Sequence, residues 1–182
     1  MALRSFLILL LLAPLANPGS SLKLDRVWKR YRNPRWGFCV SYPARWVKGD
    51  AFDGAGIFVE AGLKKRSRPT GEINIAAEPG AFGLVQNVEV HLDGLKKFER
   101  AEQVELLEKR EIQLLGSSAL FAKDRYYDPL DHSRWMDELV FANHKQTLYK
   151  LELECPTDQV TRFEPVFTRL VSTFEFDCAD DR

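Results

Sequence analysis

The sequence predicts an α+β domain built from an antiparallel sheet and two helices. Most of the chain consists of short segments in which apolar and polar residues alternate, the pattern of half-buried strands. Two other segments repeat their apolar residues every three or four positions, which is typical of amphipathic helices. The strands of the second half follow one another through short turns, and short turns favour antiparallel pairing.

Residues 1–21 have the pattern of a secretory signal peptide. Arg4 gives a positive start, an apolar run covers 6–16, and small residues lead to a predicted cleavage site after Ser21. The run is shorter than the roughly 20 residues of a spanning helix, although an uncleaved anchor is the alternative. We therefore expect an exported protein, periplasmic or secreted, that does not span the membrane once the leader is removed, with 22–182 as a single globular domain.

The amino-acid composition is that of a globular protein and gives no support for nucleic acid as a partner. Hydrophobic residues make up 45% of the chain, as in ordinary globular proteins. The 26 Lys and Arg residues balance the 26 Asp and Glu residues, so no basic surplus favours nucleic acid.

The first strands are predicted around the stretch 31–46. A strand is expected over 24–32, followed by a tight turn at 33–37, a second strand, and a turn that begins at Pro43. The apolar residues expected to form one edge of the core are Phe38, Val40, Tyr42 and Trp46.

Glycine and aspartate predict a loop over 48–55, and strands follow over 56–61 and 72–77. The basic connection at 64–71 is interpreted as a solvated hairpin tip, with an anion site as the alternative. From Asn87, a plausible N-cap, the period changes to that of a helix running to about Arg100. Its apolar stripe comprises Val88, Leu92, Leu95 and Phe98.

The second half predicts four strands and a closing helix. The strands are expected over 104–115, 119–127, 135–142 and 147–155. In the last strand Tyr149, Leu151 and Leu153 face the core, whereas Lys150, Glu152 and Glu154 face water or polar contacts. Thr157 can cap the closing helix, in which Pro165 indicates either a start near Glu164 or a kinked turn before it.

Three cysteines allow one disulfide and one leftover thiol in an exported protein. A Cys155–Cys178 bond would need the chain to return along most of a helix about 20 Å long, so it would be strained. The sequence leaves open two pairings, Cys39 with Cys155 and Cys39 with Cys178. It also leaves open that no disulfide forms at all.

One set of residues spans most of the predicted domain and comprises Tyr31, Asn33, Gly37–Phe38, Val40, Tyr42–Pro43, Trp46, the strand 149–156 that ends at a proline, and Ser172–Phe176 after the closing helix. This set resembles the PsbP-like group of the Mog1/PsbP fold. The resemblance implies an α/β/α sandwich, an antiparallel sheet between helices. It implies no activity, since members include an extrinsic photosystem subunit, a nuclear transport factor and exported bacterial proteins of unassigned role.

Motifs that carry chemistry are absent from the sequence: there is no G-x-S-x-G, C-x-x-C, H-E-x-x-H, P-loop or G-x-G-x-x-G. His91, His132 and His144 belong to three different predicted elements, and each is interpreted as a surface histidine. No catalytic residue and no cofactor is predicted.

The segment 123–138 is the richest in chemically capable side chains. Asp128, Asp131 and His132 share one loop and are weak candidates for metal ligands, although a polar hairpin loop explains them as well. The aromatic residues that flank the loop, and that would suit partner contact if exposed or the core if not, are Tyr126, Tyr127 and Trp135.

The leader, the resemblance and the missing catalytic motifs together favour a non-enzymatic exported binding or scaffolding module for an unknown protein or small ligand. One alternative is a metal-dependent or hydrolytic enzyme that uses the loop 128–132. Another is an extrinsic subunit of a membrane-associated complex.

Overall fold

The computed structural model describes residues 27–49, 56–60, 71–80 and 83–178. The predicted leader, the basic connection at 64–70 and most of the predicted loop at 48–55 lie outside these residues. Among the described helices, none is long and apolar enough to cross a membrane.

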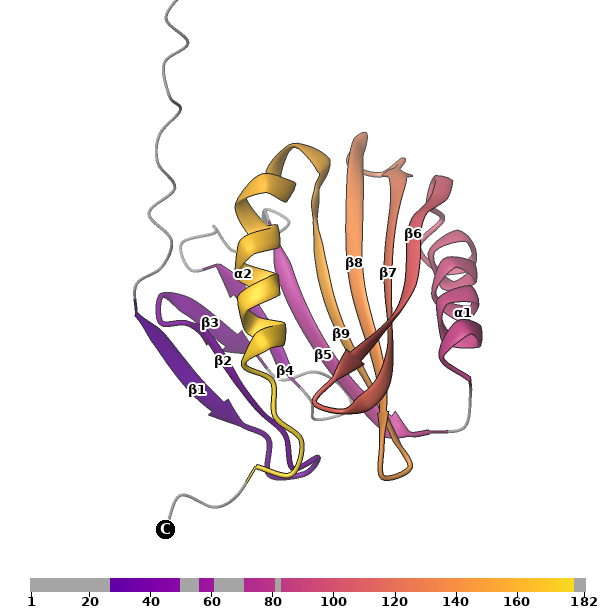
Figure 1. Ribbon diagram of the computed structural model, residues 1–182. Coiled ribbons are helices and arrows are strands. Elements are labelled where there is room, and N and C mark those ends of the chain that lie inside the picture. Colours follow the sequence, from indigo (N-terminus) through magenta and orange to yellow (C-terminus); the bar gives the residue numbers. More distant parts are fainter. Residues whose placement is uncertain (1–26, 50–55, 61–70, 81–82, 179–182) are drawn as a thin grey trace, which may run out of the picture.

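A seven-stranded sheet with the order β3-β4-β5-β9-β8-β7-β6 forms the centre of the molecule (Figure 1). Every neighbouring pair in it is antiparallel. A separate antiparallel ribbon joins β1 to β2. The strands are β1 Trp28–Arg32, β2 Cys39–Pro43, β3 Trp46–Gly49, β4 Gly56–Glu60, β5 Glu72–Pro79, β6 Glu102–Leu114, β7 Ser117–Asp128, β8 Ser133–His144 and β9 Thr147–Pro156.

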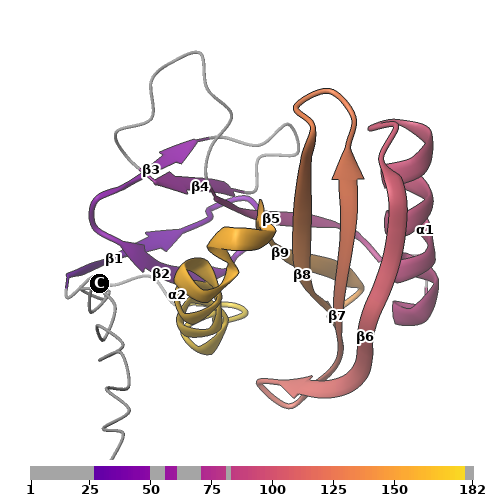
Figure 2. The ribbon, with the colours of Figure 1, turned by 90° about the horizontal axis from the view of Figure 1, so that it is seen from above.

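Two helices lie against the sheet, α1 (Leu84–Lys97) beside β6, β7 and β8, and α2 (Val160–Ser172) beside β9 and β2 (Figure 2). A single 3₁₀ turn, Thr157–Gln159, leads into α2. The helices cover opposite faces, because Leu151 on β9 packs with α2 whereas Leu148, an odd number of residues away, packs with α1. The predicted α+β class with an antiparallel sheet is thereby confirmed.

The face under α2 carries the larger apolar core. Alternate residues of β5 and β9 meet the apolar stripe of α2, and the ribbon β1–β2 closes the core at its side. Its largest fully buried side chains are Phe38, Phe58, Phe163, Phe167, Phe174, Ile73, Ile75, Leu151, Leu153, Leu170 and Val40. Burying each of these side chains contributes roughly 1.5–3 kcal/mol, so this face supplies much of the folding free energy.

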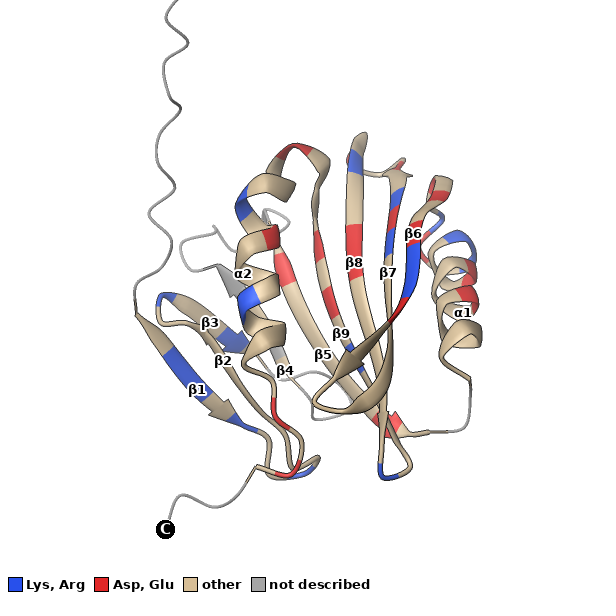
Figure 3. Cartoon of the chain, in the orientation of Figure 1, with Lys and Arg blue, Asp and Glu red and all other residues tan. Residues whose placement is uncertain are grey.

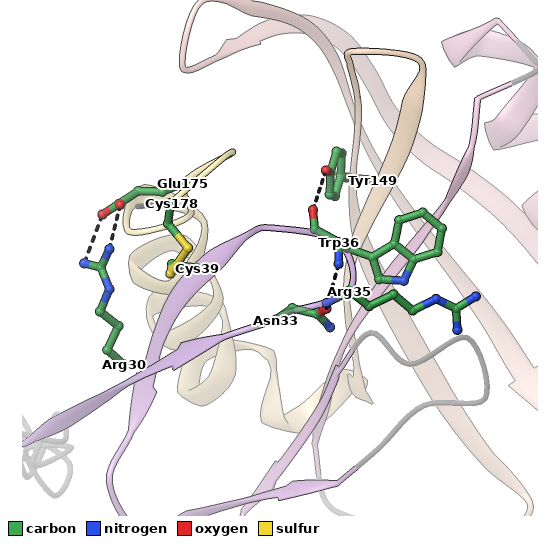
Figure 4. Close-up of a disulfide and its surroundings, with 8 residues drawn as sticks. All are labelled: Arg30, Asn33, Arg35, Trp36, Cys39, Tyr149, Glu175 and Cys178. Carbon is green, nitrogen blue, oxygen red and sulfur yellow. Dashed lines mark hydrogen bonds and ion pairs between the residues drawn. A yellow bond between two sulfur atoms is a disulfide. The ribbon is translucent and has the colours of Figure 1, made fainter. Parts of the chain in front are cut away.

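The stretch 31–46 has the structural role that its pattern predicts. Phe38, Val40 and Trp46 are buried in the core and Tyr42 is half-buried against it. The turn before β2 is organised by Asn33, whose Oδ1 accepts hydrogen bonds from the backbone N–H of Arg35 and of Trp36, each at 2.9 Å (Figure 4).

Two elements differ from their prediction. The first two residues of the predicted loop 48–55 belong to strand β3, because Trp46–Gly49 pairs with β4 at the edge of the sheet. Helix α1 starts three residues before Asn87, so Asn87 is not the N-cap; it is buried and its Nδ2 donates to the carbonyl of Gly83.

Pro165 lies inside α2, at the sixth residue of the helix, so the helix does not start near Glu164. The position is exposed, on the side of the helix away from the sheet. Solvent can therefore satisfy the carbonyl whose hydrogen bond the proline removes.

A disulfide joins Cys39 to Cys178, one of the two pairings that the sequence leaves open (Figure 4). The segment after α2 pairs with the start of β2 through Cys39 N–H to Glu175 O and Glu175 N–H to Cys39 O, both 2.9 Å. This pairing brings the two Cα atoms within 5.7 Å, inside the usual range for a disulfide. Cys155 on β9 is left as a buried free thiol.

We expect Cys178→Ser to lower the free energy of unfolding by roughly 2–5 kcal/mol, because the bond closes a loop between residues 139 positions apart. Urea denaturation with and without reductant measures this. Cys155→Ala serves as the matched control and should keep the full dependence on reductant. A Cys178→Ser protein as stable as the oxidised wild type would contradict the expectation.

Cys155 should be unreactive in the folded protein. Burial, and then the nearby carboxylates Asp137 and Glu138, raise the pKa of its thiol to about 12. Relative to an ordinary thiol the thiolate fraction falls by about a thousandfold. A thiol-specific chromogenic reagent should therefore titrate no thiol in the native protein and one in the unfolded, unreduced protein; rapid labelling of the native protein would show this wrong.

Candidate functional site

A row of acidic side chains crosses the sheet beneath α1. Asp124 on β7 lies directly opposite Asp137 on β8, which lies opposite Glu154 on β9. Figure 3 shows the acidic positions of β8 and β9 side by side near the middle of the sheet. Like charges directly opposite one another destabilise a sheet, so this row requires compensating positive charge.

Asp124 and Asp137 are also removed from water. Their exposed fractions are 0% and 2%. On this face of the sheet, the neighbouring cross-strand pair on one side is Ala122 with Leu139, and the pair on the other side is Tyr126 with Trp135. We call these two pairs the apolar rows. A buried carboxylate between apolar rows persists only with a partner.

Helix α1 supplies that partner through His91. Val88 and Leu95 lie three and four residues from it on the same side of the helix, and each packs on one of the two apolar rows. His91 is thereby held over the acidic row, with Nε2 at 3.2 Å from Oδ2 of Asp124 and 3.3 Å from Oδ2 of Asp137. Only 10% of its side chain is exposed.

The other nitrogen of His91 faces β9. Its Nδ1 lies 3.5 Å from Oε1 of Glu152, whose Oε2 is held at 2.8 Å by Nζ of Lys150. Glu152 and Lys150 are two residues apart on one strand, so they share the face under α1. We call His91, Asp124, Asp137, Lys150 and Glu152 the charged cluster.

The charged cluster strongly favours a cation at His91. Burial alone would lower the pKa of the imidazole, but Asp124 and Asp137 outweigh it and raise that pKa to about 10. Burial raises the pKa of Asp124 and that of Asp137. Burial also opposes ionisation of Glu152, but Lys150 outweighs it and lowers the pKa of that carboxyl. With three carboxylates against two cationic side chains, the charged cluster has an excess of acidic groups.

His91, Asp124 and Asp137 could hold a metal ion. One donor atom from each lies within 4.8 Å of the other two, and this is the one such group of three among the described residues. His91 Nε2, both carboxylate oxygens of Asp124 and Oδ1 of Asp137 take part in no hydrogen bond. Their close approaches to one another are ion-pair contacts without hydrogen-bond geometry.

A pocket of about 310 Å³ opens next to the charged cluster, between α1 and the sheet. Its lining residues are Ala76, Glu78, Asn87, Val90, His91, Phe141, Leu148 and Lys150. His91 and Lys150 belong to both the pocket and the charged cluster. A molecule in the pocket would therefore contact two side chains whose positions are fixed by the carboxylates of the cluster. A second pocket of about 320 Å³ lies at the start of α1, against β6 and β7.

The interpretation of His91 as a surface histidine is wrong, because the helix turns it onto the sheet. A signal for the site was present in the sequence. Asp124 and Asp137 are four residues from the ends of the hairpin 128–133, so hairpin pairing alone places them opposite each other.

His144 is partly exposed, stacks on Phe176, and places Nε2 at 2.7 Å from Oδ2 of Asp177.

The loop 128–132 uses its carboxylates to close a turn. Oδ1 of Asp128 accepts the backbone N–H of Leu130 at 2.8 Å. Oδ1 of Asp131 accepts both the backbone N–H and the hydroxyl of Ser133, and its Oδ2 accepts Nε1–H of Trp135 at 3.2 Å. Nδ1 of exposed His132 lies 3.2 Å from the hydroxyl of Tyr127. Within the described residues, the three weak metal candidates do not form a ligand group.

Two of the three flanking aromatic residues do not reach the surface. Tyr126 and Trp135 are opposite each other on β7 and β8, with exposed fractions of 3% and 4%, and pack against α1. Of the two alternatives, the core therefore applies to Tyr126 and Trp135, and partner contact through these two is excluded. Tyr127, on the other face, is half-buried.

No family model matches the chain, and no curated protein matches its sequence. Solved structures match its fold. A cyanobacterial PsbP (CyanoP) from Synechocystis sp. PCC 6803 has a TM-score of 0.63 at 13% identity, over 90% of this chain and 99% of that one. The Ran-binding protein Mog1p of Saccharomyces cerevisiae has a TM-score of 0.61 at 9% identity, over 83% and 96%. LpqN of Mycobacterium tuberculosis, involved in cell envelope biogenesis, has a TM-score of 0.58 at 11% identity, over 81% and 89%.

Proposed function

We propose that this chain, which has the Mog1/PsbP-like fold, is an exported, non-enzymatic binding module, and that its ligand site is the pocket between α1 and the sheet. The observation that carries the proposal is the position of this 310 Å³ pocket, with Lys150 and His91 at its wall. Concave sites with a few convergent polar groups are where small molecules bind proteins.

The pocket wall indicates the chemistry of the ligand. Val90, Phe141 and Leu148 give one apolar surface, and the polar groups are Glu78, Asn87, His91 and Lys150. Lys150 is fixed by Glu152 rather than free to swing away. A small molecule with an apolar body and a polar or charged end fits this arrangement best.

Binding as the role is supported by one structural neighbour, since Mog1p is described as a Ran-binding protein. That likeness is one of fold, and the ligand need not be related. Export is supported by the leader pattern of residues 1–21 and by the Cys39–Cys178 disulfide, because disulfides persist in oxidising compartments outside the cytosol.

The pocket is tested with two matched variants on α1. Val90 lines this pocket and is 57% exposed, whereas Val85 lines the second pocket and is 46% exposed. We expect Val90→Trp to cover the pocket and weaken binding by tenfold or more (about 1.4 kcal/mol), and Val85→Trp to leave binding unchanged. Ligand-observed NMR with a library of small amphipathic compounds measures both. Compounds that bind Val90→Trp as tightly as the wild type would contradict the proposal.

Export is tested separately by the mass of the mature protein. When the full chain is produced in a bacterial host with its own leader, the exported product should begin at Leu22 and contain one disulfide and one thiol. Intact-mass analysis with and without reductant measures both features. Recovery of the chain with Met1 retained, in the cytosolic fraction, would show that the leader is not cleaved.

A further inference from the structure

We propose that His91, Asp124 and Asp137 bind a divalent transition-metal ion, with Zn²⁺ the best match. The site lies between α1 and the strands β7 and β8, at the inner side of the ligand pocket. The inference concerns the metal alone and holds whether or not the pocket takes an organic ligand.

The distances from His91 to the two carboxylates match those between ligand atoms of a tetrahedral site. Zn²⁺ binds nitrogen and oxygen ligands at about 2.0–2.1 Å, so two ligand atoms on one ion are about 3.3–3.4 Å apart in a tetrahedral site. Nε2 of His91 lies 3.2 Å from Oδ2 of Asp124 and 3.3 Å from Oδ2 of Asp137. One donor atom of each side chain lies within 4.8 Å of the other two, so the three side chains can reach one small ion.

Buried donor atoms that take part in no hydrogen bond provide a second argument. Asp124 is 0% exposed and neither of its carboxylate oxygens takes part in a hydrogen bond. Oδ1 of Asp137 and Nε2 of His91 are likewise without one. Buried polar atoms in folded proteins nearly always have a partner, and a cation coordinated by Nε2 of His91 and Oδ2 of Asp124 would provide it for these two donor atoms.

A proton on His91 satisfies this arrangement less well than a metal ion. Nε2 carries a single N–H, which can point at Asp124 or at Asp137 but not along both directions at once. A metal ion bonds to all three side chains. It also sets two positive charges against the two facing carboxylates, whereas an imidazolium supplies one.

The surroundings of His91 match those of a metal-binding histidine. Such a histidine turns its second ring nitrogen toward a carboxylate, which fixes the ring orientation. Nδ1 of His91 faces Oε1 of Glu152 at 3.5 Å, and Glu152 is itself held by Lys150. Glu152 is therefore a positioning residue for the site.

The type and number of ligands select the class of metal. One imidazole and two carboxylates suit Zn²⁺ and its transition-metal neighbours. Ca²⁺ requires six to eight oxygen ligands and Mg²⁺ prefers oxygen and water, so neither is matched by this group. Three protein ligands leave the fourth tetrahedral position to water.

The test uses the full mature protein with its disulfide intact, stripped with a chelator and titrated with Zn²⁺ in a calorimeter. We expect one Zn²⁺ per chain and a rise in Tm when Zn²⁺ is added, since an ion that binds the folded state stabilises it. Asp124→Asn is nearly isosteric and should weaken Zn²⁺ binding by about 100-fold or more, and Glu152→Gln by about 10- to 100-fold. Asp93→Asn, on the exposed side of α1, should bind Zn²⁺ as the wild type does.

A measurement on the wild type alone covers the case in which the buried variants fail to fold. Co²⁺ added to the stripped protein should give the intense visible absorption of tetrahedral coordination, and Zn²⁺ should displace it. Less than about 0.1 equivalent of bound Zn²⁺ with unchanged Tm would overturn the proposal. A preference for Ca²⁺ or Mg²⁺ over Zn²⁺ would also overturn it. Zn²⁺ binding that Asp124→Asn leaves intact would overturn it as well, because it would show an adventitious ion only. Val90→Trp should keep its Zn²⁺, which separates this site from the ligand pocket.

Discussion

The pairing of Asp124 with Asp137 across the β7–β8 hairpin places two carboxylates side by side in a buried part of the sheet, and the architecture around α1 follows from it. Antiparallel register makes the contact unavoidable, and the apolar rows on either side exclude water. Without a cation above them the two charges would destabilise the sheet. Helix α1 meets this constraint by packing Val88 and Leu95 on the apolar rows and turning His91 onto the acids between them.

The two faces of the sheet thus have different roles in this Mog1/PsbP-like fold. The face under α2 is an apolar core closed by the ribbon β1–β2 and tied to the end of the chain by the Cys39–Cys178 disulfide. The face under α1 divides its area between apolar contacts and the charged cluster, and a pocket opens beside it. Buried charge is costly to folding, and the large apolar core on the face under α2 compensates for it.

Much of the fold could be predicted from local pattern. The alternation in β5, β7 and β9 and the apolar stripe of α2 predict these elements correctly, because each of them packs an apolar face on the core and that packing gives its sequence a period. Strand β3 was missed since its four residues precede a segment rich in glycine and aspartate, and only pairing with β4 makes it a strand. The candidate site could not be predicted for a related reason. The apolar stripe of α1 is clear in the sequence, but the residues that face His91 beneath this helix, Asp124 and Asp137, are more than 30 positions away in the chain.

The sequence by itself determined the α+β class, the antiparallel meander, the core role of Phe38, Val40 and Trp46, and the alternation that separates Leu151 from Lys150 on β9. These are consequences of short-range periodicity, which each segment carries alone. Only the tertiary structure decided which cysteine Cys39 bonds and that a helix covers the polar side of β9. Both depend on distances between segments far apart in the chain, and such distances are set by how the helices dock on the sheet rather than by any local pattern.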